Sequence, residues 1–236
     1  MEFLELLKTG RPVLLDGGMG TMLQARGLPV GAAPETAALE HPEWLREIHS
    51  AYLDAGSQIV YANTFGANRE KLAHCGRTVA EVVPAAVSVA REAARGRGLV
   101  ALDVGPIGQL LEPTGTLEFE QAVDIFAEVV EAGAAAGADL IAIESMTDLQ
   151  EARAALLAAR EHSSLPVLVT MTYEATGRTF LGCSPACAAL TLEGLGADAI
   201  GVNCSLGPRE MPPLVEELLR WTTLPIVLKP NAGLPH

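Results

Sequence analysis

The chain has 236 residues, of which 49% are hydrophobic and only 4% aromatic, so we expect one domain with a core of Ala, Val, Leu and Ile. Acidic residues outnumber basic ones by 29 to 16, which gives a formal charge of -13. Such a surface, without a run of Lys and Arg, argues against a nucleic acid or an anionic membrane as a partner.

The first ten residues mix leucines with Glu2, Glu5 and Lys8, which predicts a short amphipathic helix rather than a signal peptide. No stretch of the sequence is long and apolar enough to span a bilayer, so we expect a cytoplasmic location. In a reducing compartment, cysteines are free, metal-binding or catalytic more often than disulfide-bonded. The cysteines are Cys75, Cys183, Cys187 and Cys204.

Seven short apolar runs alternate with helix-like segments along the chain. Each run ends in Gly, Asp, Asn, Thr or Ser, and the runs begin at Pro12, Gln58, Leu99, Asp139, Pro166, Asp198 and Pro225. Apolar residues at three-to-four spacing predict helices over 119–136, 148–161 and 208–221. Pro185 and Pro208 stand where the first turn of a helix accepts proline.

Apolar strands that alternate with helices predict a parallel sheet covered on both faces. Seven repeats favour a (β/α)₈ TIM-type barrel over a doubly wound sheet, and the glycine cluster of DGGMGT lacks the dinucleotide-binding spacing. We expect one barrel domain over residues 1–236. The seventh run leaves no room for an eighth strand and helix, so the barrel is expected to lack its last βα unit.

Polar residues follow the apolar runs, and in a barrel these strand ends form one functional rim. Asp16 and Glu144 supply two carboxylates there, next to the backbone N–H groups of the Gly17–Gly18 turn. Carboxylates suit the ammonium of an amino acid, and N–H donors suit its carboxylate. The alternative is that Asp16 and Glu144 only cap turns and helices.

Cys204 ends the sixth run, in GVNCSLGP, and supports two interpretations. It is either a small buried side chain or a zinc thiolate, and a catalytic zinc site needs about three protein ligands. Cys183 and Cys187 are four residues apart, but Pro185 places the first of them before the helix, so we expect both to pack rather than bind metal. The histidines do not lie at strand ends, and none is expected to act as a general base.

A series of motifs in order along the chain resembles the homocysteine S-methyltransferase family, most closely the homocysteine-binding module of its cobalamin-dependent members. The motifs are LLDGGMGTMLQARGL, ANTFGANREKL, LDVGPIGQLLEPTG, IAIESMTDLQEA, MTYEATGRTFLGCSP, IGVNCSLGP and KPNAGLP. The resemblance covers essentially the whole chain. It implies a (β/α)₈ barrel with a zinc ion at the rim that holds the homocysteine thiol as a thiolate. A free thiol has a pKa of about 8.5, and zinc lowers it.

The resemblance also assigns roles to single residues. Cys204 falls on a zinc-ligand position, and Asn231 on a residue that approaches the metal when substrate is absent. Asp16, Gly17, Gly18, Thr64, Glu144 and Asn203 fall on substrate-binding positions, the two carboxylates holding the amino group of homocysteine. No catalytic residue is expected beyond the zinc site.

The sequence departs from the family at the other zinc ligands, an adjacent cysteine pair in a G-G-C-C-G motif, which is absent here. We therefore expect an incomplete zinc site and a chain that is inactive or weakly active alone. The implied activity is methyl transfer to homocysteine, giving methionine, with zinc and a methylcobalamin-carrying domain or protein as partners. Two alternatives are a methyltransferase that uses betaine or S-methylmethionine, and a non-catalytic homocysteine-binding or assembly module.

Overall fold

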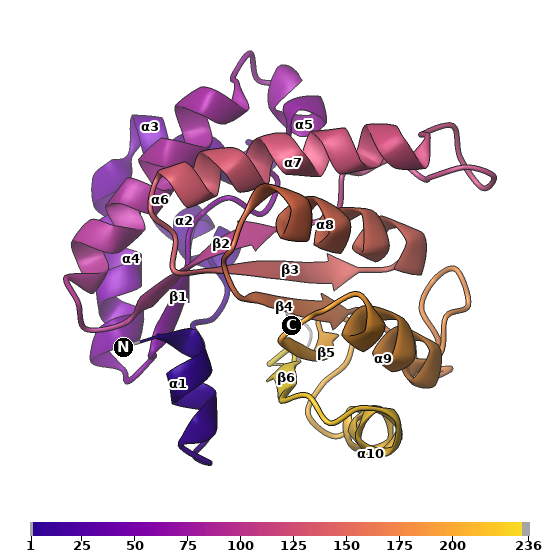
Figure 1. The fold of residues 1–236 in the computed structure, drawn as a ribbon. Coiled ribbons are helices and arrows are strands. Elements are labelled where there is room, and N and C mark those ends of the chain that lie inside the picture. Colours follow the sequence, from indigo (N-terminus) through magenta and orange to yellow (C-terminus); the bar gives the residue numbers. More distant parts are fainter. Residues whose placement is uncertain (1, 233–236) are drawn as a thin grey trace.

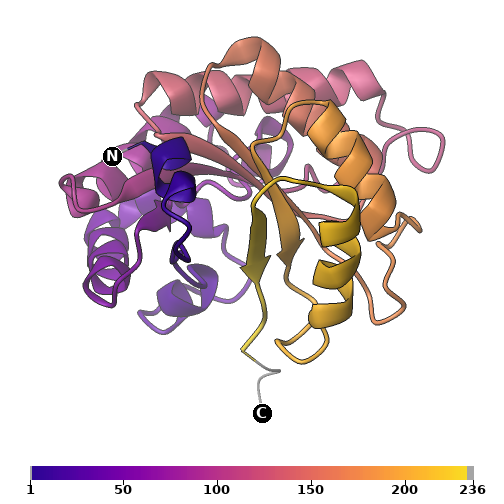
Figure 2. The same cartoon turned by 60° about the horizontal axis from the view of Figure 1, so that its bottom comes forward.

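The computed structural model describes residues 2–232, and within them six parallel strands form one sheet in sequence order (Figure 1). The strands are β1 (Ile59–Tyr61), β2 (Leu99–Val104), β3 (Leu140–Met146), β4 (Val167–Met171), β5 (Ala199–Asn203) and β6 (Ile226–Lys229). Gly233–Pro235 of the KPNAGLP motif and His236 lie outside the described residues. The sheet curls into a half-barrel, which confirms the predicted α/β barrel class (Figure 2).

Helices connect the strands and cover the convex face of the sheet (Figures 1 and 2). The helices are α1 (Phe3–Lys8), α2 (Gly20–Gln24), α3 (Ala37–Glu40), α4 (Pro42–Asp54), α5 (Arg69–Ala73), α6 (Val79–Ala94), α7 (Phe119–Ala135), α8 (Leu149–His162), α9 (Pro185–Gly194) and α10 (Pro212–Trp221), with a 3₁₀ turn over Pro34–Thr36. No helix among residues 2–232 is both long enough and apolar enough to cross a membrane.

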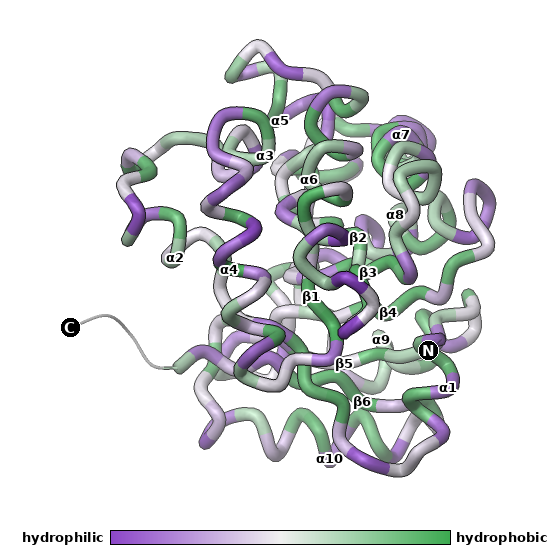
Figure 3. The backbone as a smooth tube through the Cα atoms, turned by 90° about the vertical axis from the view of Figure 1, so that its left-hand side faces the viewer, coloured by the Kyte–Doolittle hydropathy of each residue, from purple (hydrophilic) through white to green (hydrophobic). Residues whose placement is uncertain are grey.

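Strands β1, β2, β4 and β5 are buried along their whole length, and most of their residues are apolar, as the green stretches of the tube show (Figure 3). Alternate residues point to opposite faces of a strand, and β2 shows the consequence. Leu102 packs in the outer cluster beneath the helices, whereas Ala101 packs in an inner cluster on the concave face. Phe3 and Leu6 of α1 join the inner cluster, so this short helix covers part of the concave face.

The predicted helices form with small shifts of their ends. The capping residues explain two of the starts: Asp148 accepts from the backbone N–H of Gln150 before α8, and Ser184 accepts from that of Cys187 before α9. Pro185 occupies the first turn of α9, as predicted. Pro208 does not start α10, because residues 208–211 form a turn and the helix begins at Pro212.

The first predicted strand, from Pro12, is wrong: this segment makes a single parallel bridge, between Leu15 and Ile59. Pro12 has no N–H to donate, and the ladder is limited to a few bonds, such as Asp16 N to the Ile59 carbonyl at 3.1 Å. The chain then leaves the sheet through the Gly17–Gly18 turn. The bridge nevertheless fixes Asp16 beside the end of β1.

Candidate functional site

The C-terminal ends of the strands border a cleft of about 760 Å³. Because parallel strands end at the same edge of a sheet, side chains far apart in sequence meet there. Among the sequence-predicted residues, Asp16, Gly17, Gly18, Glu144, Asn203, Cys204 and Asn231 line the cleft. Thr64 does not line it, because its hydroxyl donates to the backbone carbonyl of Asp103 at 2.8 Å and is fully buried.

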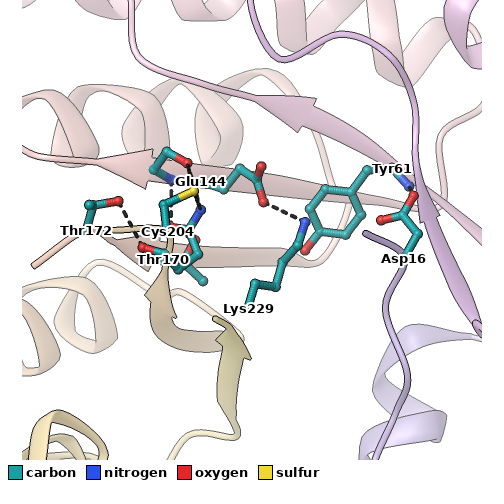
Figure 4. Close-up of polar contacts among 9 residues, drawn as sticks. Asp16, Tyr61, Glu144, Thr170, Thr172, Cys204 and Lys229 are labelled. Carbon is teal, nitrogen blue, oxygen red and sulfur yellow. Dashed lines mark hydrogen bonds and ion pairs between the residues drawn. The ribbon is translucent and has the colours of Figure 1, made fainter. Parts of the chain in front are cut away.

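Asp16 is buried at one end of the cleft (Figure 4). Its Oδ2 accepts from the backbone N–H of Tyr61 at 2.7 Å, whereas its Oδ1 is buried and has no hydrogen-bond partner within residues 2–232. Burial raises the pKa of Asp16 to about 7, although the nearby Lys229 opposes the shift. The carboxyl group is therefore held ready for a hydrogen-bond donor or a cation that the described residues do not supply.

Glu144 and Lys229 form an ion pair in the middle of the cleft, with Oε2 and Nζ 2.9 Å apart (Figure 4). The ammonium also lies 3.7 Å from the centroid of the Tyr61 ring, a cation–π distance. Burial alone lowers the pKa of Lys229, but the carboxylates of Glu144, Asp103 and Asp16 outweigh it and the net shift is upward. Lys229 is thus a firmly charged ammonium in the cleft.

Asp103 adds a third carboxyl group from the end of β2. It is buried, its Oδ1 lacks a hydrogen-bond partner in the described part of the chain, and it lines the cleft. Burial, followed by the negative charge of Glu144, raises the pKa of Asp103 well above its usual range. Beside the Glu144–Lys229 ion pair, the cleft therefore presents two buried carboxyl groups, Asp16 and Asp103, each with one oxygen that has no partner among residues 2–232.

Asn203 organises the other end of the cleft. Its Oδ1 accepts from the backbone N–H of Ser145 and from the Thr170 hydroxyl, both at 2.9 Å, and its Nδ2 donates to the Ser145 hydroxyl at 2.7 Å. Nδ2 also lies 3.4 Å from the Sγ of Cys204, which is 3.5 Å from the Ser145 hydroxyl. These bonds hold the strand ends of β3 and β5 together and leave the thiol of Cys204 exposed.

Three residues at this end of the cleft have left-handed backbone conformations. The φ angles of Ser145, Cys204 and Ser205 are 62°, 57° and 60°, values that favour glycine. Such conformations cost of order 1–3 kcal/mol each and gather at functional sites. The backbone that presents Cys204 is therefore strained, and the network around Asn203 holds it.

The donors present do not fit a complete metal site. Residues 2–232 contain no group of three His, Cys, Asp or Glu side chains placed to hold one ion. Cys183 is half-buried beside α9, and Cys187 is exposed, so the expectation that both pack is wrong for Cys187. Asn231 lines the cleft, with its backbone N–H donating to the Leu206 carbonyl at 3.0 Å. Within residues 2–232, Cys204 is the one cysteine that lines the cleft.

The structure also places in the cleft three residues that the sequence analysis did not single out, Lys229, Tyr61 and Ser145. The sequence held one signal for Lys229, a charged residue at the end of the apolar run PIVLK. Its position opposite Asn203 depends on the pairing of β5 with β6, which the local sequence does not specify. Tyr61 carried no signal, because an aromatic residue in a strand is common.

Comparisons with known proteins agree with one another. Residues 13–236 match the family model described as homocysteine S-methyltransferase. The methionine synthase of Mycobacterium tuberculosis (strain ATCC 25618 / H37Rv) is 32% identical over 244 residues, which cover 95% of this chain and 20% of that protein. The methionine synthase of Mycobacterium leprae (strain TN) is 31% identical over 252 residues, covering 98% and 21%. The chain spans about a fifth of the length of these curated relatives.

Among solved structures, the metallated form of the homocysteine methyltransferase MmuM from Escherichia coli superposes with a TM-score of 0.87 at 25% identity. The match covers 98% of this chain and 87% of that one. The oxidized form of the same enzyme gives a TM-score of 0.84 at 26% identity. The half-barrel described above is therefore shared with a homocysteine methyltransferase over nearly its whole extent.

Proposed function

Because the chain belongs to the homocysteine S-methyltransferase family, we propose that its cleft binds homocysteine and presents the thiol for methylation, giving methionine. The observation that carries the proposal is the order of groups along the cleft. The carboxyl group of Asp16 lies at one end, the thiol of Cys204 lies at the other, and the Glu144 carboxylate lies between them (Figure 4). Residues 1–236 act in this proposal as a homocysteine-binding barrel domain.

The amino-acid part of the substrate binds at the carboxylate end. Its ammonium pairs with Glu144 and Asp16, since charge-assisted hydrogen bonds are among the stronger polar contacts. Its carboxylate faces the backbone of Gly17 and Gly18, which is exposed at the cleft. Asn203 positions Ser145 and Cys204 at the sulfur end. The Thr64 hydroxyl bonds the backbone carbonyl of Asp103 and so holds that residue in place beneath the cleft.

The reaction is a transfer of one methyl group. A bond forms between the homocysteine sulfur and the methyl carbon, the bond from donor to carbon breaks with its electron pair on the donor, and the thiol proton passes to solvent. Zinc is the cofactor that the family resemblance implies, and the metallated form of the E. coli enzyme supports a metal in relatives. Since the described residues offer Cys204 without a full ligand set, we assign Cys204 as one zinc ligand and derive no step through the metal.

The methyl donor proposed here is methylcobalamin on a partner domain or protein, by analogy with the methionine synthases that the chain resembles. Donors of the betaine or S-methylmethionine type form the alternative. Assay of methionine formation with each donor separates them. Activity with a small sulfonium or ammonium donor alone would contradict the cobalamin assignment.

A second function, a non-catalytic binding or assembly module, has one observation in its favour. Leu14 and Leu228, at the two borders of the cleft, are 55% and 46% exposed. Exposed apolar residues at sheet edges favour association. Sedimentation over a range of concentrations tests this function: reversible self-association without methyl transfer supports it, and a monomer at all concentrations contradicts it.

Calorimetric titration with L-homocysteine under reducing conditions tests the proposed function. We expect binding by the wild-type chain and at least about tenfold weaker binding by Glu144→Gln, because a hydrogen bond to a charged group contributes roughly 1.5–3 kcal/mol. Glu161→Gln changes an exposed carboxylate on α8 and serves as the matched control. Equal affinity of Glu144→Gln and the control would contradict the proposal, as would a wild-type chain that binds no homocysteine.

A further inference from the structure

Lys229 ends β6 on the inner face of the sheet, in register with Asn203 of β5. Its side chain is 18% exposed, and that of its partner Glu144 is 13% exposed. A lysine usually keeps its ammonium in water, whereas this one ends inside the cleft. Its charge therefore lies against the carboxylate that is proposed to hold the amino group of the substrate.

Several polar atoms around Lys229 have no hydrogen-bond partner in the described part of the chain, although its ammonium can still donate. An ammonium donates three hydrogen bonds, and within residues 2–232 the Nζ of Lys229 has Glu144 as its acceptor. Oδ1 of Asp16, Oδ1 of Asp103 and the hydroxyl of Tyr61 are buried without a hydrogen-bond partner in the same part of the chain. Buried polar atoms are normally partnered. The spare acceptors indicate that the cluster is built to take another donor.

A ligand ammonium that pairs with Glu144 competes with Lys229, which is already bonded to that carboxylate. The Lys229 ammonium donates to the Glu144 carboxylate and lies 3.7 Å from the centroid of the Tyr61 ring, so it already occupies the place beside both groups (Figure 4). Lysine suits an exchange of this kind, because its compact primary ammonium sits on a flexible four-carbon stem. The carboxyl oxygens of Asp16 and Asp103 that are unpartnered within residues 2–232 offer one of the two ammonium groups a hydrogen-bond partner inside the cleft.

We propose that Lys229 is a tethered ammonium that occupies the amino-group position of the cleft in the ligand-free chain and leaves Glu144 when a ligand ammonium binds. The proposal rests on the proposed function in taking this end of the cleft as the amino-group position. Lys229 is then a specificity-determining residue. A ligand without an ammonium leaves Lys229 bonded to Glu144. A ligand with a primary ammonium takes the place of Lys229, so that one ammonium–carboxylate pair replaces another of the same kind.

The exchange is observed by NMR on the wild-type chain with ¹⁵N-labelled lysine side chains. The other lysines, Lys8 and Lys71, are internal references, and the Lys229 signal is assigned by its absence from Lys229→Gln. Propylammonium chloride is the probe of the exchange, with sodium chloride at equal ionic strength as the control. We expect propylammonium, but not sodium, to shift or broaden the Lys229 signal, with Lys8 and Lys71 unchanged.

The ligand pair homocysteine and 4-mercaptobutyrate, which lacks the amino group, then tests specificity. Homocysteine is expected to change the Lys229 signal and 4-mercaptobutyrate is not. An unchanged Lys229 signal at saturating propylammonium overturns the exchange, whatever homocysteine does. A response to propylammonium with no response to homocysteine supports the exchange and contradicts the proposed function, so the two failures are distinguishable.

Affinity supplies the second measurement. If Lys229 occupies Glu144 for about nine-tenths of the time, Lys229→Met tightens the binding of propylammonium about tenfold, because the competent fraction rises to one. Lys229→Arg keeps a tethered cation and is expected to bind as weakly as the wild type. Equal or weaker binding by a folded Lys229→Met overturns the proposal. If Lys229→Met does not fold, the NMR result on the wild-type chain decides the question.

Discussion

Asp16 combines burial with an unpartnered oxygen, and its protonation therefore links folding to pH. In the folded chain its pKa is about 7, whereas an unfolded chain has an aspartate pKa of about 4. Between these values the folded chain holds more protons than the unfolded one, so a rise in pH lowers the free energy of unfolding. The contribution is present in full below about pH 4 and is lost as pH rises through about 7.

We expect Asp16→Asn to remove this pH dependence. Relative to the wild type, the variant should gain stability from pH 4 to pH 7, by at most about 1.4 kcal/mol per pH unit. Urea unfolding at a series of pH values measures the difference. Glu161→Gln is the control, since that side chain is exposed. Parallel stability curves for Asp16→Asn and the wild type would show that Asp16 is not protonated on folding.

The strained turn after β5 gives a second prediction at the residue scale. Ser205 is exposed, has a φ of 60°, and its side chain makes no hydrogen bond within the described residues. Ser205→Gly should therefore raise the free energy of unfolding by about 0.5–1 kcal/mol, because glycine adopts this conformation without strain.

The same substitution at Ser88, exposed in the middle of α6, should have the opposite sign. Glycine in a helix interior costs roughly 0.5–1 kcal/mol. Thermal or urea unfolding of both variants measures the pair. A loss of stability in Ser205→Gly equal to that in Ser88→Gly would mean that the turn is not strained.

Single residues also show what the sequence can and cannot predict about the site. Asp16, Glu144 and Cys204 were predicted to share a rim because each follows an apolar run, and they do line one cleft. Lys229 was not predicted, since its place opposite Asn203 and against Glu144 comes from strand pairing. The end of a strand can be predicted from the local sequence, whereas the residues that face one another across the cleft depend on how the strands pair.

At the scale of elements, β5 and β6 approach unusually closely at Gly201. A Cβ atom there would lie 1.9 Å from the Val227 carbonyl oxygen, so no larger residue fits without moving β6. Because β6 carries Lys229, the close packing of Gly201 against Val227 also fixes where Lys229 lies in the cleft.

Gly201→Ala should therefore lower the free energy of unfolding by about 1–3 kcal/mol, the usual cost of an overpacked core. Gly194→Ala, at the last residue of α9 with open space around it, should be neutral or stabilising by up to about 1 kcal/mol. Circular dichroism during urea unfolding measures both. Similar stabilities for the two alanine variants would contradict the close approach of β5 and β6.

The elements themselves were largely predictable. The runs from Gln58 to Asp198 form strands that are buried along nearly their whole length, which a continuous apolar pattern reports, and the run from Pro225 forms the half-buried edge strand β6. The run from Pro12 is equally apolar but makes only one bridge. Pro12 has no N–H to donate to a neighbouring strand, and the chain leaves the sheet at Gly17 and Gly18, so few residues remain for pairing. Similarly, the start of α10 at Pro212 rather than Pro208 is decided by the turn that precedes it.

At the scale of the whole molecule, the half-barrel separates stability from function. Apolar side chains and α1 fill the concave face toward the starts of the strands, and polar side chains gather at their ends. The barrel predicted from the sequence implied polar residues at the strand ends, and the structure places them there. Residues 2–232 hold no group of three possible metal ligands around Cys204, so more observations support the proposed amino-group position than the proposed zinc ligand.

The central claim is that this rim is a homocysteine site with its amino-group position at Glu144. A crystal structure of the chain with L-homocysteine tests it most directly. We expect the ligand ammonium within about 3 Å of the Glu144 carboxylate, the ligand sulfur on the Cys204 side, and Lys229 moved from Glu144. A ligand bound in the cleft with its ammonium directed away from Glu144, or a cleft that stays empty at saturating homocysteine, would contradict the account.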